Sequence, residues 1–304
     1  MLTVEEALDL TLIEEGQYLL GLNFITNVLG LSWDNISKIF YKTLKEYAKR
    51  RPIKETRVIE GGINGSFYMP EGTLAVRAIR YDILDDYPRT MFNDFGQLNY
   101  EYEEHTRRLR SFPPMSSLRV TYTREYKLTD EEISVPEYMA DYENSYYTRL
   151  LTKPKKGCIV VTKDGKTMKE VGIEKKVIDM GPGREHAVQQ VIKLSGDLGK
   201  GYYRPDTREL DITFKKGTAS DLVVTYTPYY KVAPELSTGD YIFMKFFKSY
   251  ILEAIAALRS QATQRDLQNI DLNSDDLHAR AMILKAEVER NLRETIDFGS
   301  MAPI

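Results

Sequence analysis

The chain has 304 residues, 42% of them hydrophobic and 29% charged, which is typical of a folded globular protein and excludes a disordered tail. Its 42 basic and 45 acidic side chains leave a formal net charge of −3, so the whole chain has no positive field that would draw it onto nucleic acid or anionic lipid. The single cysteine, Cys158, excludes an internal disulfide and a cysteine-cluster metal site. The 21 tyrosines favour a β-rich body or a tyrosine-lined contact surface.

Residues 1–57 are predicted to form an N-terminal helical segment. Thr3 and Glu6 make a T-x-x-E capping box, which predicts a helix from Val4 to about Glu15. A second, amphipathic helix with a basic last turn ends before Pro52. The acidic start lacks the basic n-region of a secretory leader, so we expect the chain to stay in the cytoplasm of the cell that makes it.

Residues 58–235 are predicted to form a β-rich middle domain, because the period of apolar residues changes there from 3.6 to 2. Asp164-Gly165 between two such runs is a hairpin signal. Residues 87–114 are aromatic, charged and bounded by proline, and we interpret them as a loop insertion. The predicted strands are Leu74–Leu84, Leu118–Leu128, Gly157–Thr162, Val171–Met180, Ala187–Leu194, Glu209–Lys215 and Leu222–Tyr230.

The helical period returns over residues 236–296, which are predicted to form a C-terminal helical hairpin that packs on the N-terminal helices. Asp240 begins the first helix and Ser274 is a good N-cap for the second. Residues 297–304 are expected to extend from the helical hairpin as a C-terminal arm. The fold class is therefore predicted to be α+β: a helical layer from both ends of the chain and an antiparallel, sandwich- or barrel-like β-rich middle.

The common catalytic spacings are absent from the sequence, so we expect no enzyme, no catalytic residue, no cofactor and no metal site. Gly181-Pro182-Gly183-Arg184 is the nearest approach to a phosphate cradle, but Pro182 has no amide hydrogen, and an ordinary turn explains the segment. Each of the three histidines is separate from other metal-ligating residues. Cys158 lies on a predicted strand and is interpreted as a small buried hydrophobic residue.

Charge is distributed unevenly along the chain. Residues 128–143 are acidic and residues 149–176 are mainly basic, which suits docking between neighbouring subunits, although solvated loops are the simpler explanation of either segment taken alone. The candidate residues for a subunit interface are Asp130, Glu131, Glu132 and Glu137. Basic residues near aromatic ones can bind a nucleic-acid backbone. The candidate DNA contacts are Arg107, Arg108, Arg110, Lys153, Lys155 and Lys156.

The order of a basic helix, a strand-rich middle and a terminal helical hairpin resembles the neck (head completion) proteins of contractile-tailed, T4-like bacteriophages. The resemblance is architectural. Its most specific parts are Leu31-Ser32-Trp33-Asp34-Asn35-Ile36 leading into Tyr41–Tyr47, and Tyr250–Arg265, Ile270-Asp271 and Leu277–Glu294.

The resemblance implies a virion structural protein, made in the host cytoplasm, that forms a homo-oligomeric ring matching a twelve-fold portal. Such a ring binds the portal protein, seals the DNA-filled head and carries a second neck or tail-terminator protein. It touches packaged DNA non-specifically and no membrane. Two alternatives stay open: another phage tail or baseplate subunit, and an enzyme or module that binds a small molecule.

Overall fold

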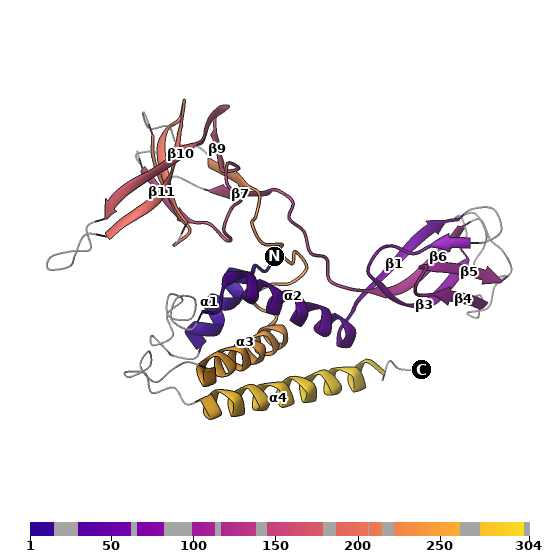
Figure 1. Ribbon diagram of the computed structural model, residues 1–304. Coiled ribbons are helices and arrows are strands. Elements are labelled where there is room, and N and C mark those ends of the chain that lie inside the picture. The colour runs from indigo at the N-terminus through magenta and orange to yellow at the C-terminus, as the bar shows by residue number, and fades with distance from the viewer. Residues whose placement is uncertain are drawn as a thin grey trace. The chain divides into compact units, whose positions relative to one another are not determined.

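The computed structural model of the chain is an α+β fold, which confirms the fold class predicted from the sequence (Figure 1). The structure describes residues 1–14, 30–61, 66–81, 99–112, 117–137, 145–178, 187–205, 207–214, 222–261 and 274–300. The chain divides into two compact units. The first unit comprises Met1–Gln17 and Leu128–Gly239, and the second comprises Tyr18–Lys127 and Asp240–Ile304.

An eight-stranded antiparallel sheet that curls into a half-barrel forms most of the first unit (Figure 1). Its strand order is β7-β14-β9-β10-β11-β12-β13-β8. Alternate residues of β12 and β14 are buried, because successive side chains of a strand point to opposite faces of the sheet. The strands are β7 (Ile133–Glu137), β8 (Ser145–Arg149), β9 (Val160–Lys163), β10 (Lys166–Ile178), β11 (Ala187–Gly196), β12 (Gly199–Arg204), β13 (Glu209–Phe214) and β14 (Leu222–Tyr226).

The predicted hairpin signal at Asp164-Gly165 is confirmed, since Lys163 and Lys166 pair across this two-residue turn. Both turn residues have positive φ, 49° at Asp164 and 73° at Gly165, as a type I′ turn requires. The turn therefore fixes the register of β9 against β10.

Strands β10 and β11 extend beyond their other partners as a two-stranded arm, defined as residues 171–178 and 187–191 (Figure 1). Strand β9 pairs with β10 only over Lys166–Lys169, and β12 pairs with β11 only over Ile192–Ser195. At about 3.3 Å per residue, the arm reaches roughly 25 Å past these partners.

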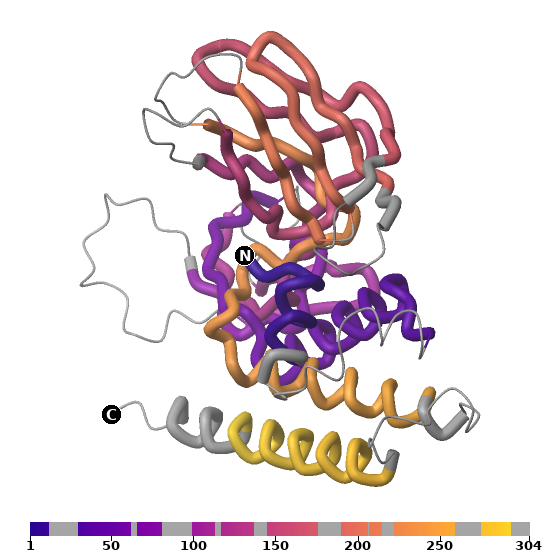
Figure 2. Tube along the Cα trace, turned by 90° about the vertical axis from the view of Figure 1, so that its left-hand side faces the viewer, coloured from indigo at the N-terminus to yellow at the C-terminus, as the bar shows by residue number. Residues whose placement is uncertain are grey.

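In the second unit, α3 (Tyr241–Gln261) and α4 (Ser274–Ser300) lie side by side and antiparallel (Figures 1 and 2). Helix α2 (Trp33–Arg50) begins after Ser32, whose hydroxyl accepts a hydrogen bond from the Asn35 amide at 3.3 Å. It packs on α3 through Phe40, whose ring centroid lies 5.4 Å from that of Phe243 and 5.6 Å from that of Phe247. Aromatic edge-to-face contacts therefore hold these two helices together.

Two three-stranded antiparallel sheets, β1-β6-β3 and β2-β5-β4, complete the second unit. They enclose a small core that includes Phe67, Leu109, Val120 and Tyr122. The strands are β1 (Ile53–Glu60), β2 (Ser66–Tyr68), β3 (Thr73–Tyr81), β4 (Asn99–Glu103), β5 (Arg108–Phe112) and β6 (Ser117–Arg124).

The loop interpretation of residues 87–114 was wrong for residues 99–112, which form the β4–β5 hairpin. Strand β4 is almost wholly exposed, and the buried face of β5 combines Leu109 with the polar Ser111, so neither strand shows a clear apolar alternation. Residues 82–98 and 113–116 lie outside the described residues.

The boundaries of the two units differ from those of the expected segments 1–57, 58–235 and 236–296. Helix α1 (Val4–Glu14) belongs to the first unit and α2 to the second, and the β-rich middle is divided after Lys127. The reason is a long-range pairing that local patterns do not reveal. Leu2 forms a reciprocal backbone bridge with Ala233, at 2.9 and 3.0 Å, which joins the start of the chain to the end of the first unit.

Candidate functional site

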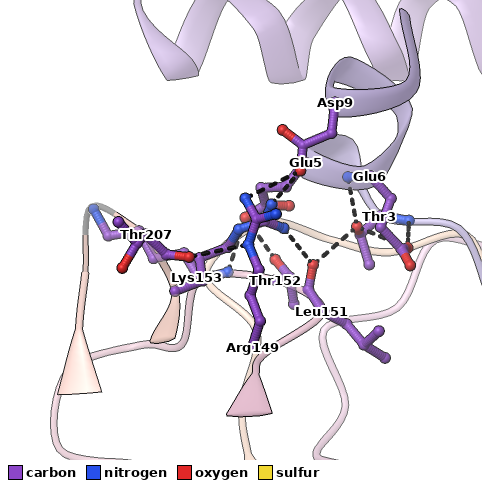
Figure 3. Close-up of polar contacts among 10 residues, drawn as sticks. Thr3, Glu5, Glu6, Asp9, Arg149, Leu151, Thr152, Lys153 and Thr207 are labelled. Carbon is purple, nitrogen blue, oxygen red and sulfur yellow. Dashed lines mark hydrogen bonds and ion pairs between the residues drawn. The ribbon is translucent and has the colours of Figure 1, made fainter. Parts of the chain in front are cut away.

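Helix α1 is held against the chain that follows β8 by a network of polar contacts (Figure 3). The predicted capping box is confirmed: the Thr3 hydroxyl accepts from the Glu6 amide at 3.1 Å, and Glu6 Oε2 accepts from the Thr3 amide at 3.1 Å. The same Thr3 hydroxyl lies 3.2 Å from the carbonyl oxygen of Leu151. The cap therefore both begins the helix and attaches it to a segment nearly 150 residues away.

Glu5 is the central residue of this network, with only 2% of its surface exposed. Its Oε1 accepts from the Thr152 hydroxyl at 2.7 Å and from the Lys153 amide at 2.9 Å (Figure 3). Its Oε2 is buried and has no hydrogen-bond partner among the described residues. Burial raises the pKa of Glu5 above the ordinary value of 4.5, against the opposing effect of its hydrogen bonds and of Arg208.

Asp9, one turn after Glu5, brings two arginines to the same face of α1. Its carboxylate pairs with Arg208, and it lies 3.3 Å from Arg149. The Arg208 side chain, 8% exposed, also donates to the Leu151 carbonyl at 2.7 Å. Arg208 has a φ of 61°, a left-handed conformation that is uncommon for a residue other than glycine. The turn before β13 thus holds a buried guanidinium under α1.

Two tyrosines of the first unit, Tyr203 and Tyr226, are buried in the same low-dielectric surroundings as Glu5. Burial raises the pKa of Tyr226 to about 12, and burial followed by the charge of Glu5 raises the pKa of Tyr203. The Tyr203 hydroxyl is buried without a hydrogen-bond partner among the described residues.

The carboxyl of Glu5 is too deeply buried to meet solvent or substrate directly. What the arrangement can do is couple the protonation of Glu5 to the attachment of α1.

Glu5, Asp9, Arg149 and Arg208 were not predicted as site residues from the sequence. Apart from Glu6 in the capping box, the acidic residues of the first helix were used only to exclude a secretory leader. A usable signal exists: Glu5 and Asp9 share a face with the apolar Leu8, and carboxylates on a face that becomes buried require a hydrogen-bonding or basic partner. The identity of that partner depends on long-range folding.

The six candidate DNA contacts fall in two different units. Arg107, Arg108 and Arg110 belong to the second unit, at the β4–β5 hairpin, where Arg107 and Arg110 are exposed. Arg108 is partly buried and donates to the Ser66 hydroxyl at 3.0 Å. In the first unit, Lys153 and Lys156 are exposed, and the Lys153 ammonium lies over the Tyr229 ring.

The acidic interface candidates all lie in the first unit, around β7. Asp130 pairs with Lys155 within the chain, at 3.0 Å between Oδ2 and Nζ, so these two opposed charges meet inside one subunit rather than between subunits. Glu131 and Glu132 are exposed. Glu137 ends β7 and its backbone pairs with Leu222.

Two minor sequence interpretations have different outcomes. Cys158 lies just before β9 rather than on a strand and is only partly buried, so its interpretation as a buried hydrophobic residue holds only in part. It packs against the core of the large sheet, and its thiol donates to the Lys155 carbonyl at 2.8 Å. Burial raises the pKa of this thiol. Residues 181–184, which were interpreted as an ordinary turn, lie outside the described residues.

Within the described part of the chain, no group of three or more His, Cys, Asp or Glu side chains is arranged to hold a metal ion. None of the described helices is long and apolar enough to span a bilayer. Comparison with protein-family models, curated proteins and solved structures finds no match to this chain.

Proposed function

We propose that this chain is a structural subunit of a virion, a neck or head-to-tail connector protein that forms a ring beneath the portal. In this role it seals the DNA-filled head and provides the platform for tail attachment. The proposal rests on the architectural resemblance, and one structural observation supports it: the β10–β11 arm.

The arm is a poor candidate for an isolated element. A two-stranded hairpin is at best marginally stable in water, yet this one extends beyond its neighbours by residues 171–178 and 187–191. It carries two large apolar side chains on one strand, Val171 at 60% exposure and Ile173 at 55%. An exposed apolar pair on a protruding hairpin is suited to a contact with another chain.

A contact between the arm and a different surface of the next subunit is heterologous, and heterologous contacts close into rings when the rotation permits. Further exposed aromatic residues in both units, Tyr68, Tyr147 and Tyr241, offer surfaces for portal and tail partners. A connector needs this property, because each subunit contacts neighbours within the ring, above it and below it.

Electron microscopy of the purified full-length chain tests the ring. We expect closed rings for the natural protein and for Val58→Glu, and loss of rings for Ile173→Glu, which places a charge on the arm. Val58 is the matched control, because it is another exposed β-branched apolar residue on a strand, in the second unit. Monomers at every concentration, or rings that Ile173→Glu leaves intact, would contradict the arm-mediated ring.

The connector role is tested separately on phage particles. Gold-labelled antibody against the chain should bind at the junction of head and tail. Labelling of the baseplate or along the tail would identify a tail subunit instead, and the neck proposal would be wrong.

A further inference from the structure

Helix α4 has two apolar faces, only one of which is covered. Four residues on one face are buried, as expected for the side that packs on α3: Leu277, Ala281, Val288 and Leu292. On the opposite side, Ala279, Met282, Ile283 and Ala286 are exposed, with 54% of Met282 and 66% of Ile283 accessible to solvent.

These four residues, which we call the outer stripe, follow the spacing i, i+3, i+4, i+7. At about 100° per residue they lie within roughly 100° of arc, centred opposite the buried face. A surface helix of a monomer normally carries polar residues there. The outer stripe therefore needs an explanation that packing inside the chain does not provide.

The outer stripe has the same order of residue sizes in both directions along the helix. About a point between Met282 and Ile283, Ala279 mirrors Ala286, so small residues flank a large pair on each side. One turn further out, Asp275 mirrors Arg290, and both are exposed and fall on the same stripe. An antiparallel copy of the helix centred on this point would place each large residue against a large one and each acid opposite a base.

We propose that α4 pairs with α4 of a second copy of this chain, antiparallel, about a two-fold axis between Met282 and Ile283. Such an isologous contact must be self-complementary, and the outer stripe meets that condition in both shape and charge. The alanines permit close approach of the helices, Met282 and Ile283 form the centre, and Asp275 and Arg290 fix the register.

The pairing goes beyond the proposed connector function and does not depend on it. One helix face is small compared with the roughly 1,200–2,000 Å² of a standard interface, so we expect a dissociation constant of about 1–100 μM. Where rings also form, a two-fold contact would join two rings face to face.

Sedimentation equilibrium of the full-length Ile173→Glu protein tests the pairing without interference from arm contacts. We expect a reversible monomer–dimer equilibrium in the micromolar range. Adding Ile283→Glu should raise the dissociation constant at least about tenfold, since the charge enters the centre of the contact. A monomer at all concentrations, or a dimer that Ile283→Glu does not weaken, overturns the proposal. Neither result depends on whether the natural protein forms rings.

A charge exchange tests the antiparallel register. Asp275→Arg places two arginines opposite each other, and Arg290→Glu places two acids opposite each other, so each should weaken the dimer several-fold. The double variant Asp275→Arg/Arg290→Glu restores opposite charges and should regain most of the affinity. Circular dichroism checks that α4 stays helical in all three variants. A double variant no tighter than the weaker single one excludes this register.

Discussion

Glu5 shows how one buried residue makes stability depend on pH. Because burial raises its pKa, the folded chain keeps the proton at pH values where the unfolded chain has released it. The unfolded chain then binds fewer protons, and the free energy of unfolding falls as the pH rises from about 4.5 through the folded-state pKa. Attachment of α1 should therefore be strongest in mildly acidic solution.

Glu5→Gln is expected to remove this pH dependence. The amide oxygen still accepts from Thr152 and Lys153, and no charge has to be buried, so the variant should be at least as stable as the natural chain at pH 8. Urea unfolding between pH 5 and 8 measures the difference. Glu132→Gln, at an exposed position, controls for the change in net charge. A Glu5→Gln protein with the natural pH profile would contradict the role of Glu5.

In the second unit, Phe247 tests how much the aromatic core between α2 and α3 contributes to stability. It is fully buried and packs against Phe40 and Phe243, so Phe247→Ala should lower the free energy of unfolding by about 3–5 kcal/mol. Tyr241→Ala, at a residue of the same helix that is 59% exposed, should change it by about 0.5 kcal/mol or less. Equal losses of stability in the two variants would mean that α2 and α3 do not share this aromatic core.

At the scale of elements, the β10–β11 hairpin leaves no room for a side chain at Gly196. A Cβ on Gly196 would lie 2.2 Å from the Thr167 carbonyl oxygen, whereas a Cβ on Gly172 would meet nothing within 4 Å. Gly196→Ala should therefore lower the free energy of unfolding by about 1–3 kcal/mol, and Gly172→Ala should leave it unchanged or raise it slightly. Thermal unfolding of the two variants compares the same substitution in one hairpin. Equal melting temperatures would contradict the close packing at Gly196.

Elements with strong local periodicity were predicted from the sequence, and those without it were not. Helix α3 falls where the pattern placed it, and β6 begins there but ends at Arg124, four residues before the predicted end. Helix α4 begins at the predicted Ser274 but continues to Ser300, so the arm expected over residues 297–304 was wrong for residues 297–300, and residues 301–304 lie outside the described residues. Arg124, the exception on the apolar side of β6, is 8% exposed and pairs with Glu55, whose pKa it lowers. Strands β7 and β8 were missed, because they lie in segments where charge and tyrosine conceal the alternation.

The candidate site could not be predicted from local sequence patterns, because its contacts join residues that are far apart in the sequence. The T-x-x-E capping box is a signal within four residues, and it was found. The contacts of Glu5 join residues 147 and 148 positions apart, and those of Asp9 with Arg208 join residues 199 apart. Only the folded first unit brings these residues together, so the sequence shows the carboxylates without showing their partners.

At the scale of the whole molecule, the separation of the basic residues into two units makes DNA contact testable in parts. If the ring encloses a DNA channel, binding to duplex DNA should be non-specific, with dissociation constants of about 10⁻⁴–10⁻⁶ M, and should weaken steeply with salt. The exposed pairs are Arg107 with Arg110 in the second unit and Lys153 with Lys156 in the first. Arg108 and Lys155 are left out because they are only partly exposed and are bound to Ser66 and Asp130.

Reversing the charges of one exposed pair at a time should identify the unit that contacts the DNA phosphates. The double variant Arg107→Glu/Arg110→Glu, or Lys153→Glu/Lys156→Glu, should reduce the slope of log K against log salt by about 0.9 for each phosphate that the chain no longer neutralises. Lys38→Glu/Lys45→Glu on α2 makes the same change in net charge at exposed positions. Fluorescence anisotropy with two unrelated duplexes measures both slope and sequence preference. A slope that neither pair alters more than the control, or a preference for one duplex, would show that these residues do not line a DNA channel.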